Sequence, residues 1–258
     1  MASSKKTVMD REQYVVKANE LIRRSRYSLT TQQQKIVLFA ISKIKPDDTS
    51  NTVYTINLDE FCRACGFAYE DGGYYYRSLK DNLNALTRRE WCTMPDGTEQ
   101  TMSWIGDCKI NYNSSKVEIR FNPHMEPFLF GLRQNYTQYK LQNVLVFGNR
   151  YAIRLYEILR SHVTQKQLET HQTQIVKYSL DELRNVLCVA NYPRWVDFDR
   201  RVLRDAISEI NERCDDIHID YEPRRNGGRS IESVEFVINA PSRLQATMAH
   251  YKRADKLK

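Results

Sequence analysis

The chain contains an internal repeat, and this repeat restricts the possible folds more than any other sequence feature. The segment Leu58–Phe61 (LDEF) recurs as Leu180–Leu183 (LDEL), and each copy follows a short run rich in β-forming residues. A capping residue, Asn57 or Ser179, precedes each copy and is followed three positions later by a glutamate. This spacing is typical of a helix N-terminus. Each half of the chain is therefore expected to contain a strand that leads directly into a helix.

Further helices surround each copy in the same order. Arg77–Leu86 aligns with Arg201–Ile210, and apolar residues recur in both at the spacing of one helix face. A longer apolar helix is expected upstream of each copy, at Gln33–Ile44 and at Tyr151–His162.

Each half then continues as β-structure. The first half is expected to turn at Pro95–Gly97 and to add strands up to residue 121, and the second runs from Ile217–Tyr221 through an arginine-rich turn into Ile231–Ile238. A helix-turn-helix braced by a β-hairpin is a winged helix. The sequence thus predicts an α+β protein with two tandem winged-helix domains related by pseudo-symmetry. A chance likeness of two amphipathic helix pairs would not explain the shared order of six elements.

The overall charge is compatible with a polyanionic partner. The chain has 39 Lys and Arg against 32 Asp and Glu, a net charge of +7, and the two halves carry similar charge. The longest apolar runs, such as Ile36–Ile41, are too short to cross a bilayer, and no apolar signal region follows the N-terminus. We therefore expect a cytoplasmic protein without a membrane partner.

Neither a metal site nor a catalytic site is expected. Cys62 and Cys65 are the one close pair among six cysteines, and no second ligand pair stands at zinc spacing. We expect them to be reduced and to pack beside Phe61, with a metal site as the less favoured alternative. No GxxxxGK[ST] loop is present, and His218 lacks the second histidine that a rolling-circle nickase needs. We predict that the protein is not an enzyme and uses no cofactor.

The helix near Phe198–Asn211 holds the main candidates for DNA contact. Its apolar residues define an inward face, which leaves a cluster of arginines outward near its N-terminus. Recognition helices place such residues at base edges, where arginine can pair with guanine. The candidates are Arg194, Arg200, Arg201, Arg204 and Ser208. The alternative is a solvated face whose arginines pair with Asp197, Asp199 and Asp205.

The predicted wing of the second half adds basic residues. No acid lies between Pro223 and Ile231, and the tight turn Asn226–Gly228 separates the arginines. Such a tip suits phosphate or minor-groove contact, although arginines also serve to solubilise a sheet edge. The candidates are Arg224, Arg225 and Arg229.

The corresponding helix of the first half is less basic. Its outward candidates are Arg77, Lys80 and Asn84. We expect this half to contact DNA more weakly or to serve also in association. The boundary is expected within Asn122–Leu141, which gives residues 1–131 as an N-terminal domain for association and secondary DNA contact. Residues 132–258 then form a C-terminal domain for the main sequence-specific binding.

Several segments together resemble the RepB-type replication initiators of theta-replicating, iteron-containing plasmids. The resemblance covers about residues 15–240 and includes Asn19–Ile22 with Tyr27–Ile36, which look like the first two helices of that family. Its most specific segment is Phe121–Leu132, and Tyr136–Leu141 and Arg154–Tyr156 are also distinctive. The matching helix patterns, each generic on its own, are Tyr151–Leu159, Tyr178–Leu183, Phe198–Leu203 and Glu209–Asn211.

The resemblance implies two winged-helix domains that bind directly repeated origin sites, with the second domain reading most of the bases. It implies that monomers help to open an adjacent AT-rich region and recruit the host initiator and replicative helicase. It further implies that dimers, formed mainly through the first domain, repress the initiator's own gene. Conversion between the two states is implied to remodel the first domain and Asn122–Leu141.

Two other protein classes remain open from the residues alone. The first is a dimeric winged-helix repressor without initiator activity, which composition does not distinguish from an initiator. The second is a winged helix that binds only proteins, and the arginine clusters argue against this class. If two recognition helices of one chain enter successive major grooves, the DNA site spans roughly 20 base pairs.

Overall fold

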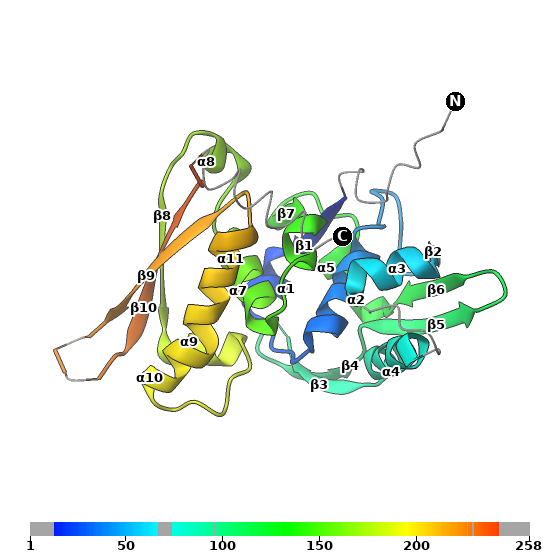
Figure 1. Cartoon of the computed structure of the whole chain (residues 1–258), viewed down its shortest axis with the longest axis horizontal. Helices are drawn as coiled ribbons and strands as arrows, with labels where there is room; N and C mark the ends of the chain where they lie inside the picture. The colour runs from blue at the N-terminus through cyan, green and yellow to red at the C-terminus, as the bar shows by residue number, and fades with distance from the viewer. Residues whose placement is uncertain (1–12, 67–73, 95, 226, 229, 243–258) are drawn as a thin grey trace. The chain divides into compact units, whose positions relative to one another are not determined.

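A computed structural model describes residues 13–66, 74–94, 96–225, 227–228 and 230–242 (Figure 1). The chain divides into two compact units, each built from three stretches. Unit 1 is Met1–Ala18, Gln32–Glu90 and Thr101–Leu145, and unit 2 is Asn19–Thr31, Trp91–Gln100 and Val146–Lys258. The predicted domains were uninterrupted stretches, whereas residues 19–31 and 91–100 group with the second unit. The functional boundary between residues 131 and 132 stays a prediction.

Unit 1 contains the elements of a winged helix in the predicted order. They are α2 (Thr31–Ile41), β2 (Tyr54–Asn57), α3 (Leu58–Cys65), α4 (Tyr74–Thr87), β5 (Ile105–Asn111) and β6 (Lys116–Phe121). The strands form an antiparallel sheet in the order β2-β6-β5, in which β5 and β6 make the wing hairpin. A separate hairpin, β3 (Glu90–Thr93) and β4 (Glu99–Met102), lies between α4 and β5 in the chain.

The core of unit 1 follows the helix spacing of the sequence. Leu79, Leu83 and Leu86 of α4 are buried, and the rings of Phe39 and Phe61 meet edge to face at 5.2 Å. Both Cys62 and Cys65 are buried and reduced on the same helix as Phe61, which confirms the packing interpretation. Burial raises the pKa of the Cys65 thiol well above its usual value, so this thiol is unreactive.

Other parts of unit 1 differ from the sequence prediction. β1 (Tyr14–Ala18) pairs antiparallel with β7 (Tyr136–Lys140), a long-range pairing that the sequence did not indicate. Asn122–Leu141, within which the domain boundary is predicted, contains a 3₁₀ turn (Pro123–Met125), α5 (Glu126–Leu129) and β7, and α6 (Leu141–Leu145) begins at its end.

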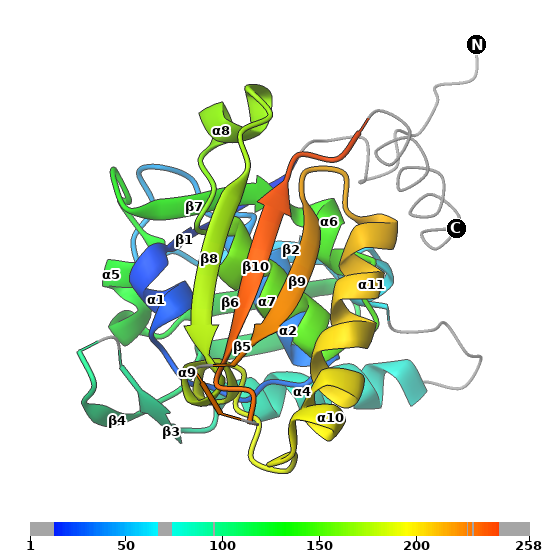
Figure 2. The same ribbon diagram turned by 90° about the vertical axis from the view of Figure 1, so that its left-hand side faces the viewer.

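Unit 2 repeats the winged-helix order. Its elements are α1 (Asn19–Arg23), α7 (Arg150–Arg160), α8 (Gln165–Glu169), β8 (Gln174–Ser179), α9 (Leu180–Val186), a helix over residues 195–213, β9 (His218–Arg224) and β10 (Ser233–Asn239). Figure 2 shows β8, β10 and β9 side by side in that order. The first helix, α1, ends at Arg23. The next helix, α2, starts two residues before and ends three residues before the helix predicted over Gln33–Ile44.

The two units share details that confirm the repeat. In each, the strand before the helix-turn-helix pairs with the last strand of the wing. The first helical residue after that strand donates a backbone hydrogen bond to the residue before the last strand: Leu58 N to Ser115 O and Leu180 N to Glu232 O, both 2.9 Å. The side chains of Asn57 and Ser179 cap these helices as predicted.

The ends of α3 and α9 are also related. Gly66 and Cys188 each lie eight residues after the start of the helix and adopt left-handed backbone conformations, with φ of 74° and 52°. Each donates its backbone N–H to the carbonyl three residues earlier. The repeat therefore uses glycine in one unit and a strained cysteine in the other.

A polar cluster fixes residues 19–31 within unit 2. Arg23 Nε donates to Ser161 Oγ at 2.8 Å, and Arg154 Nη2 donates to Ser25 O at 3.0 Å. Nearby, His162 Nε2 lies 2.7 Å from the hydroxyl of Tyr178. Burial, with the Arg23 charge, lowers the pKa of His162 to about 4.

Replacing Gly66 by alanine should lower the free energy of unfolding by about 1–2 kcal/mol, because a Cβ strains the left-handed conformation. An added Cβ at Gly66 meets only ordinary contacts, so the strain itself is tested. Urea unfolding of Gly66→Ala and of a control, Gly228→Ala, measures the effect. Gly228 has neither a positive φ nor a close neighbour. Equal stability of the two variants would contradict the prediction.

Stability should fall as the pH decreases from 7 to 5. An unfolded histidine binds a proton near pH 6.5, whereas folded His162 stays neutral until about pH 4, so acid favours the unfolded state. With allowance for partial solvent exposure we expect a loss of about 1 kcal/mol from this residue. The pH dependence of unfolding should become flatter in His162→Gln and remain unchanged in His124→Gln, which alters an exposed histidine.

Candidate nucleic-acid interface

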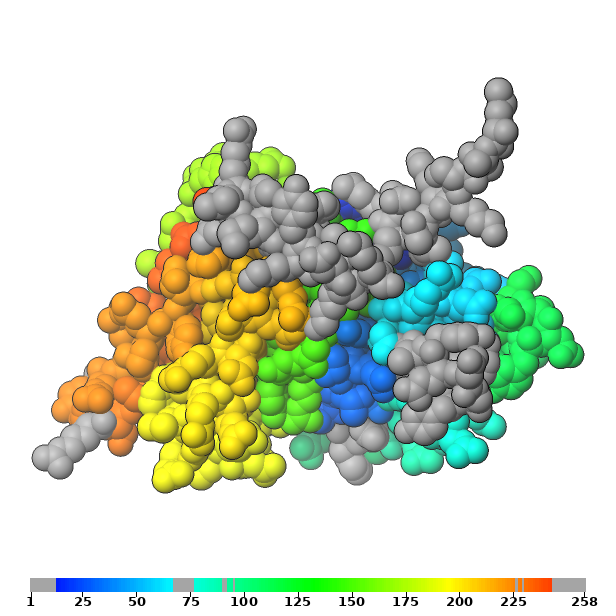
Figure 3. Space-filling view, in the orientation of Figure 1, coloured from blue at the N-terminus to red at the C-terminus, as the bar shows by residue number. Residues whose placement is uncertain are grey.

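One continuous helix over residues 195–213 carries the outward arginines of unit 2. It consists of α10 (Trp195–Phe198), a π-helical segment (Asp199–Arg204) and α11 (Asp205–Arg213). All six residues predicted to face inward are buried: Phe198, Val202, Leu203, Ala206, Ile207 and Ile210. Figure 3 shows the helix, in yellow to gold, at the surface of unit 2.

Contacts from neighbouring elements hold this helix at its beginning. Arg184 of α9 donates to Pro193 O at 2.7 Å, and its guanidinium lies 5.3 Å from the centre of the Phe198 ring. The loop before the helix and the first buried aromatic ring are therefore held by the same side chain.

Amide and carboxylate side chains hold the C-terminal half. The Asn211 side chain donates to Ile219 O and accepts from Ile219 N, both at 2.8 Å, which joins the helix to β9. Glu209 accepts from the backbone N–H groups of Gly148 and Asn149, at 2.8 and 2.9 Å, just before α7.

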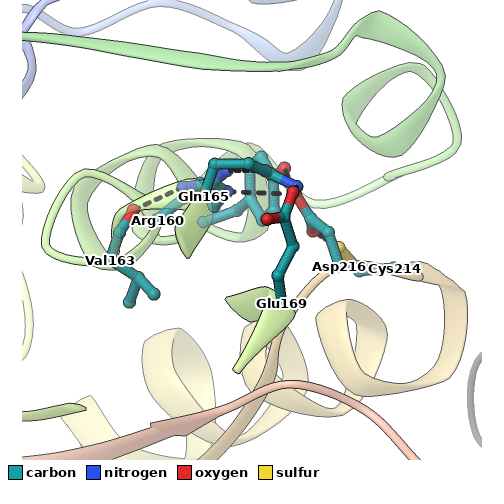
Figure 4. A network of polar contacts seen from close by, with 7 residues as sticks. Arg160, Val163, Gln165, Glu169, Cys214 and Asp216 are labelled. Carbon is teal, nitrogen blue, oxygen red and sulfur yellow. Dashed lines mark hydrogen bonds and ion pairs between the residues drawn. The ribbon is translucent and has the colours of Figure 1, made fainter. Parts of the chain in front are cut away.

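A network centred on Arg160 holds the turn after the helix (Figure 4). Arg160 Nε donates to Asp216 at 3.1 Å and Nη1 to Val163 O at 2.6 Å. Asp216 also accepts from the hydroxyl of Tyr156 at 2.9 Å and from the Cys214 thiol at 2.7 Å. Because α7 supplies Arg160 and Tyr156, the end of the helix and the start of β9 are fixed to the core of unit 2.

Acidic side chains of the same helix pair with most of its exposed arginines. Asp197 bonds Arg194 at 2.6 Å and Arg200 at 3.4 Å, and Asp199 bonds Arg204 at 2.5 Å. The acid pairing that the alternative interpretation expected is therefore present for these three arginines, whereas their part in DNA contact stays a prediction. Arg201 is exposed, and among the described residues it has no acidic partner.

Asp199 is buried although it carries a charge and the next residue, Arg200, is exposed. Its carboxylate accepts from the hydroxyl of Tyr221 on β9 as well as from Arg204. Burial and this bond raise the pKa of Tyr221 to about 12, so its hydroxyl remains a donor. The π-helical turn thus orients Arg204 through a carboxylate held by the wing, and such turns occur often at functional sites.

The wing arginines differ from one another. Arg224 was expected to be unpaired, but it bonds Glu235 at 2.7 Å and Glu222 at 2.8 Å. Glu235 lies on the opposite strand, so the sequence gap between Pro223 and Ile231 did not reveal it. Arg225 is exposed and has no acidic partner among the described residues, whereas Arg229 lies outside them.

The first-unit candidates share one exposed side of α4. Arg77, Lys80 and Asn84 are exposed at helical spacing, opposite the buried leucines.

Ser208 in unit 2 is also exposed and donates to Glu212 at 3.3 Å.

The described residues were also searched for metal sites and for helices that could span a membrane. They contain no group of three or more His, Cys, Asp or Glu side chains that could hold a metal ion. None of the described helices combines the length and apolar character that spanning a bilayer requires.

Comparison with known proteins identifies the family. The family models "Initiator Replication protein, WH1" and "Initiator Rep protein, WH2" match residues 14–160 and 179–238. An Escherichia coli "Replication initiation protein" is 29% identical over 207 residues, which cover 78% of this chain and 62% of the relative. The "PI protein" of Escherichia coli is 23% identical over 131 residues, covering 46% and 42%. The chain thus spans about three fifths or less of the length of these relatives.

A solved structure shows the same fold. The crystal structure of the Pi initiator protein in complex with iteron DNA matches with a TM-score of 0.70 and 18% identity, over 90% of this chain and 98% of that one. The order of elements, the repeated strand-to-helix junctions and the two family matches agree, and the chain therefore belongs to the family of initiator replication proteins built from two winged-helix domains.

Proposed function

We propose that this chain is a plasmid replication initiator that binds repeated origin DNA, or iterons, in a sequence-specific way. The observation that carries the proposal is the exposed arginine face of the helix over residues 195–213, which contacts with neighbouring elements hold at both ends. Family membership and the fold shared with an initiator that binds iteron DNA support it.

In this proposal the helix enters the major groove with its arginine face. Arg201 has no competing acid among the described residues and is the first candidate for a bidentate contact with guanine. Arg200 and Arg204 are already oriented by Asp197 and Asp199. The Arg200–Asp197 pair is partly exposed and contributes little, so it can rearrange at low cost when DNA supplies phosphates or bases. Arg204 is held more firmly, because its partner Asp199 is buried.

The remaining candidates have supporting roles. Arg225 contacts a phosphate near the wing, and Arg77, Lys80 and Asn84 of α4 supply a weaker contact or take part in association. Arg224 is less available because two glutamates bind it.

Binding is proposed to lead to origin opening. Several copies on adjacent repeats bend the DNA and stress a neighbouring AT-rich region, because DNA deformation can be driven by binding energy. The protein then recruits the host initiator and replicative helicase, and as a dimer it represses its own gene. It acts in the cytoplasm of the plasmid-bearing bacterium.

Selection of duplexes from a random library at about 150 mM salt tests the proposal. An enriched motif near 20 base pairs without palindromic symmetry, bound by one chain in light scattering, is expected. A palindrome bound only by dimers would favour a plain repressor. If no motif is enriched, the proposal of sequence-specific DNA binding is wrong.

Arg201→Ala should weaken binding to the selected site by about 1–3 kcal/mol and relax specificity at one base pair. The reason is that a lost bidentate contact leaves one base unread. Binding curves on the selected site and its single-base variants measure this. Lys166→Ala, which removes an exposed charge from α8 of the same unit, is the matched control. Equal weakening on every sequence would instead assign Arg201 to a phosphate.

Arg225→Ala should weaken binding almost equally on all sequences and reduce the slope of log K against log salt by about one. A phosphate contact releases counterions without reading a base, which accounts for both effects. A salt titration measures the slope, and an unchanged slope would place Arg225 outside the interface.

A further inference from the structure

The most exposed large apolar side chain among the described residues lies at the start of the helix over residues 195–213. Val196 leaves 68% of its surface accessible, more than Ile175 at 57% or Tyr112 at 53%. Single exposed apolar residues are common on protein surfaces, so exposure alone assigns no role. The informative feature of Val196 is its position among the arginines.

Val196 stands between two arginines that one carboxylate orients. Asp197 bonds Arg194 and Arg200, which lie before and after Val196 in the chain. Val196 and Arg200 are four residues apart and therefore lie on the same side of the helix. Phe198, two residues after Val196, is fully buried. The valine methyl groups thus project from the face that holds the arginines.

Folding does not account for a valine at this position. Its side chain buries little surface, and a β-branched residue is a weaker helix former than alanine or a long polar residue. An apolar group within a cationic face instead suits a ligand that is apolar at one point and anionic around it.

We propose that Val196 is a specificity-determining residue that contacts the C5 methyl group of a thymine in the major groove. This inference rests on the proposed function, because it requires the helix to enter that groove. The thymine methyl is the one apolar group that base pairs present there, and small apolar side chains recognise it.

The helix geometry places this thymine near the base that Arg200 contacts. Four residues of helix rise about 6 Å, and successive bases on one strand are about 3.4 Å apart. The thymine therefore lies within about two base pairs of any position whose specificity changes in Arg200→Ala.

Replacement of each thymine by uracil in the selected duplex tests the proposal, because uracil lacks only the C5 methyl group. Wild-type protein should lose about fourfold in affinity at one thymine, the value of one buried methyl group. In Val196→Ser the same replacement should have no effect. In a parallel scan, each cytosine of the same duplex is replaced by 5-methylcytosine. The affinity change that depends on residue 196 is expected at the thymine and not at a methylated cytosine.

Ile175→Ser is the matched control, since it changes another exposed apolar residue of unit 2, on β8. It should retain the wild-type discrimination between thymine and uracil. If a motif is enriched but no thymine responds to residue 196, the assignment of Val196 is wrong while the proposed function stands. If no motif is enriched, both fail.

Discussion

The junction between strand and helix determines the arrangement of each winged helix. At this point one strand ends, a capped helix begins, and the first helical N–H bonds the residue that precedes the last strand of the wing. A helix N-terminus has unsatisfied N–H groups, so these bonds satisfy donors that would otherwise need water. The same bonds fix the helix-turn-helix relative to the wing within each unit. Because both units contain this junction, it is the physical basis of the repeat.

Local features of the fold were predictable from sequence because local rules determine them. Asn57 and Ser179 indicated the helix starts, and the apolar spacing indicated which side of the 195–213 helix is buried. The pairing of β1 with β7 was missed, since it joins residues more than a hundred positions apart and no periodic signal links them. The ends of α2 differ by two and three residues from the predicted Gln33–Ile44, because apolar spacing indicates the buried face of a helix more clearly than its ends.

The candidate site shows a similar division between what the sequence reveals and what the fold adds. Exposure of Arg200, Arg201 and Arg204 followed from helix geometry, and Asp197 and Asp199 were named as candidate partners. Which arginine each carboxylate binds became clear only with the fold. The pairing of Arg204 with Asp199 depends on the π-helical turn and on Tyr221 of β9, which also bonds Asp199. The pairing of Arg224 with Glu235 depends on the register between β9 and β10. Asn211 and Glu209 were visible as part of a resemblance, and their structural contacts became clear only with the fold.

The way in which the chain divides has a consequence for how such proteins diversify. Each unit consists of three separate stretches, so the chain passes between the units five times. Leu21 and Ile22 of α1, near the start of the chain, are buried in the unit whose main body begins at Val146. A single recombination crossover between related genes would therefore separate side chains that pack together. Exchange of a whole unit requires several coordinated crossovers, so the two halves are expected to be inherited together and to change their DNA preference by point substitution.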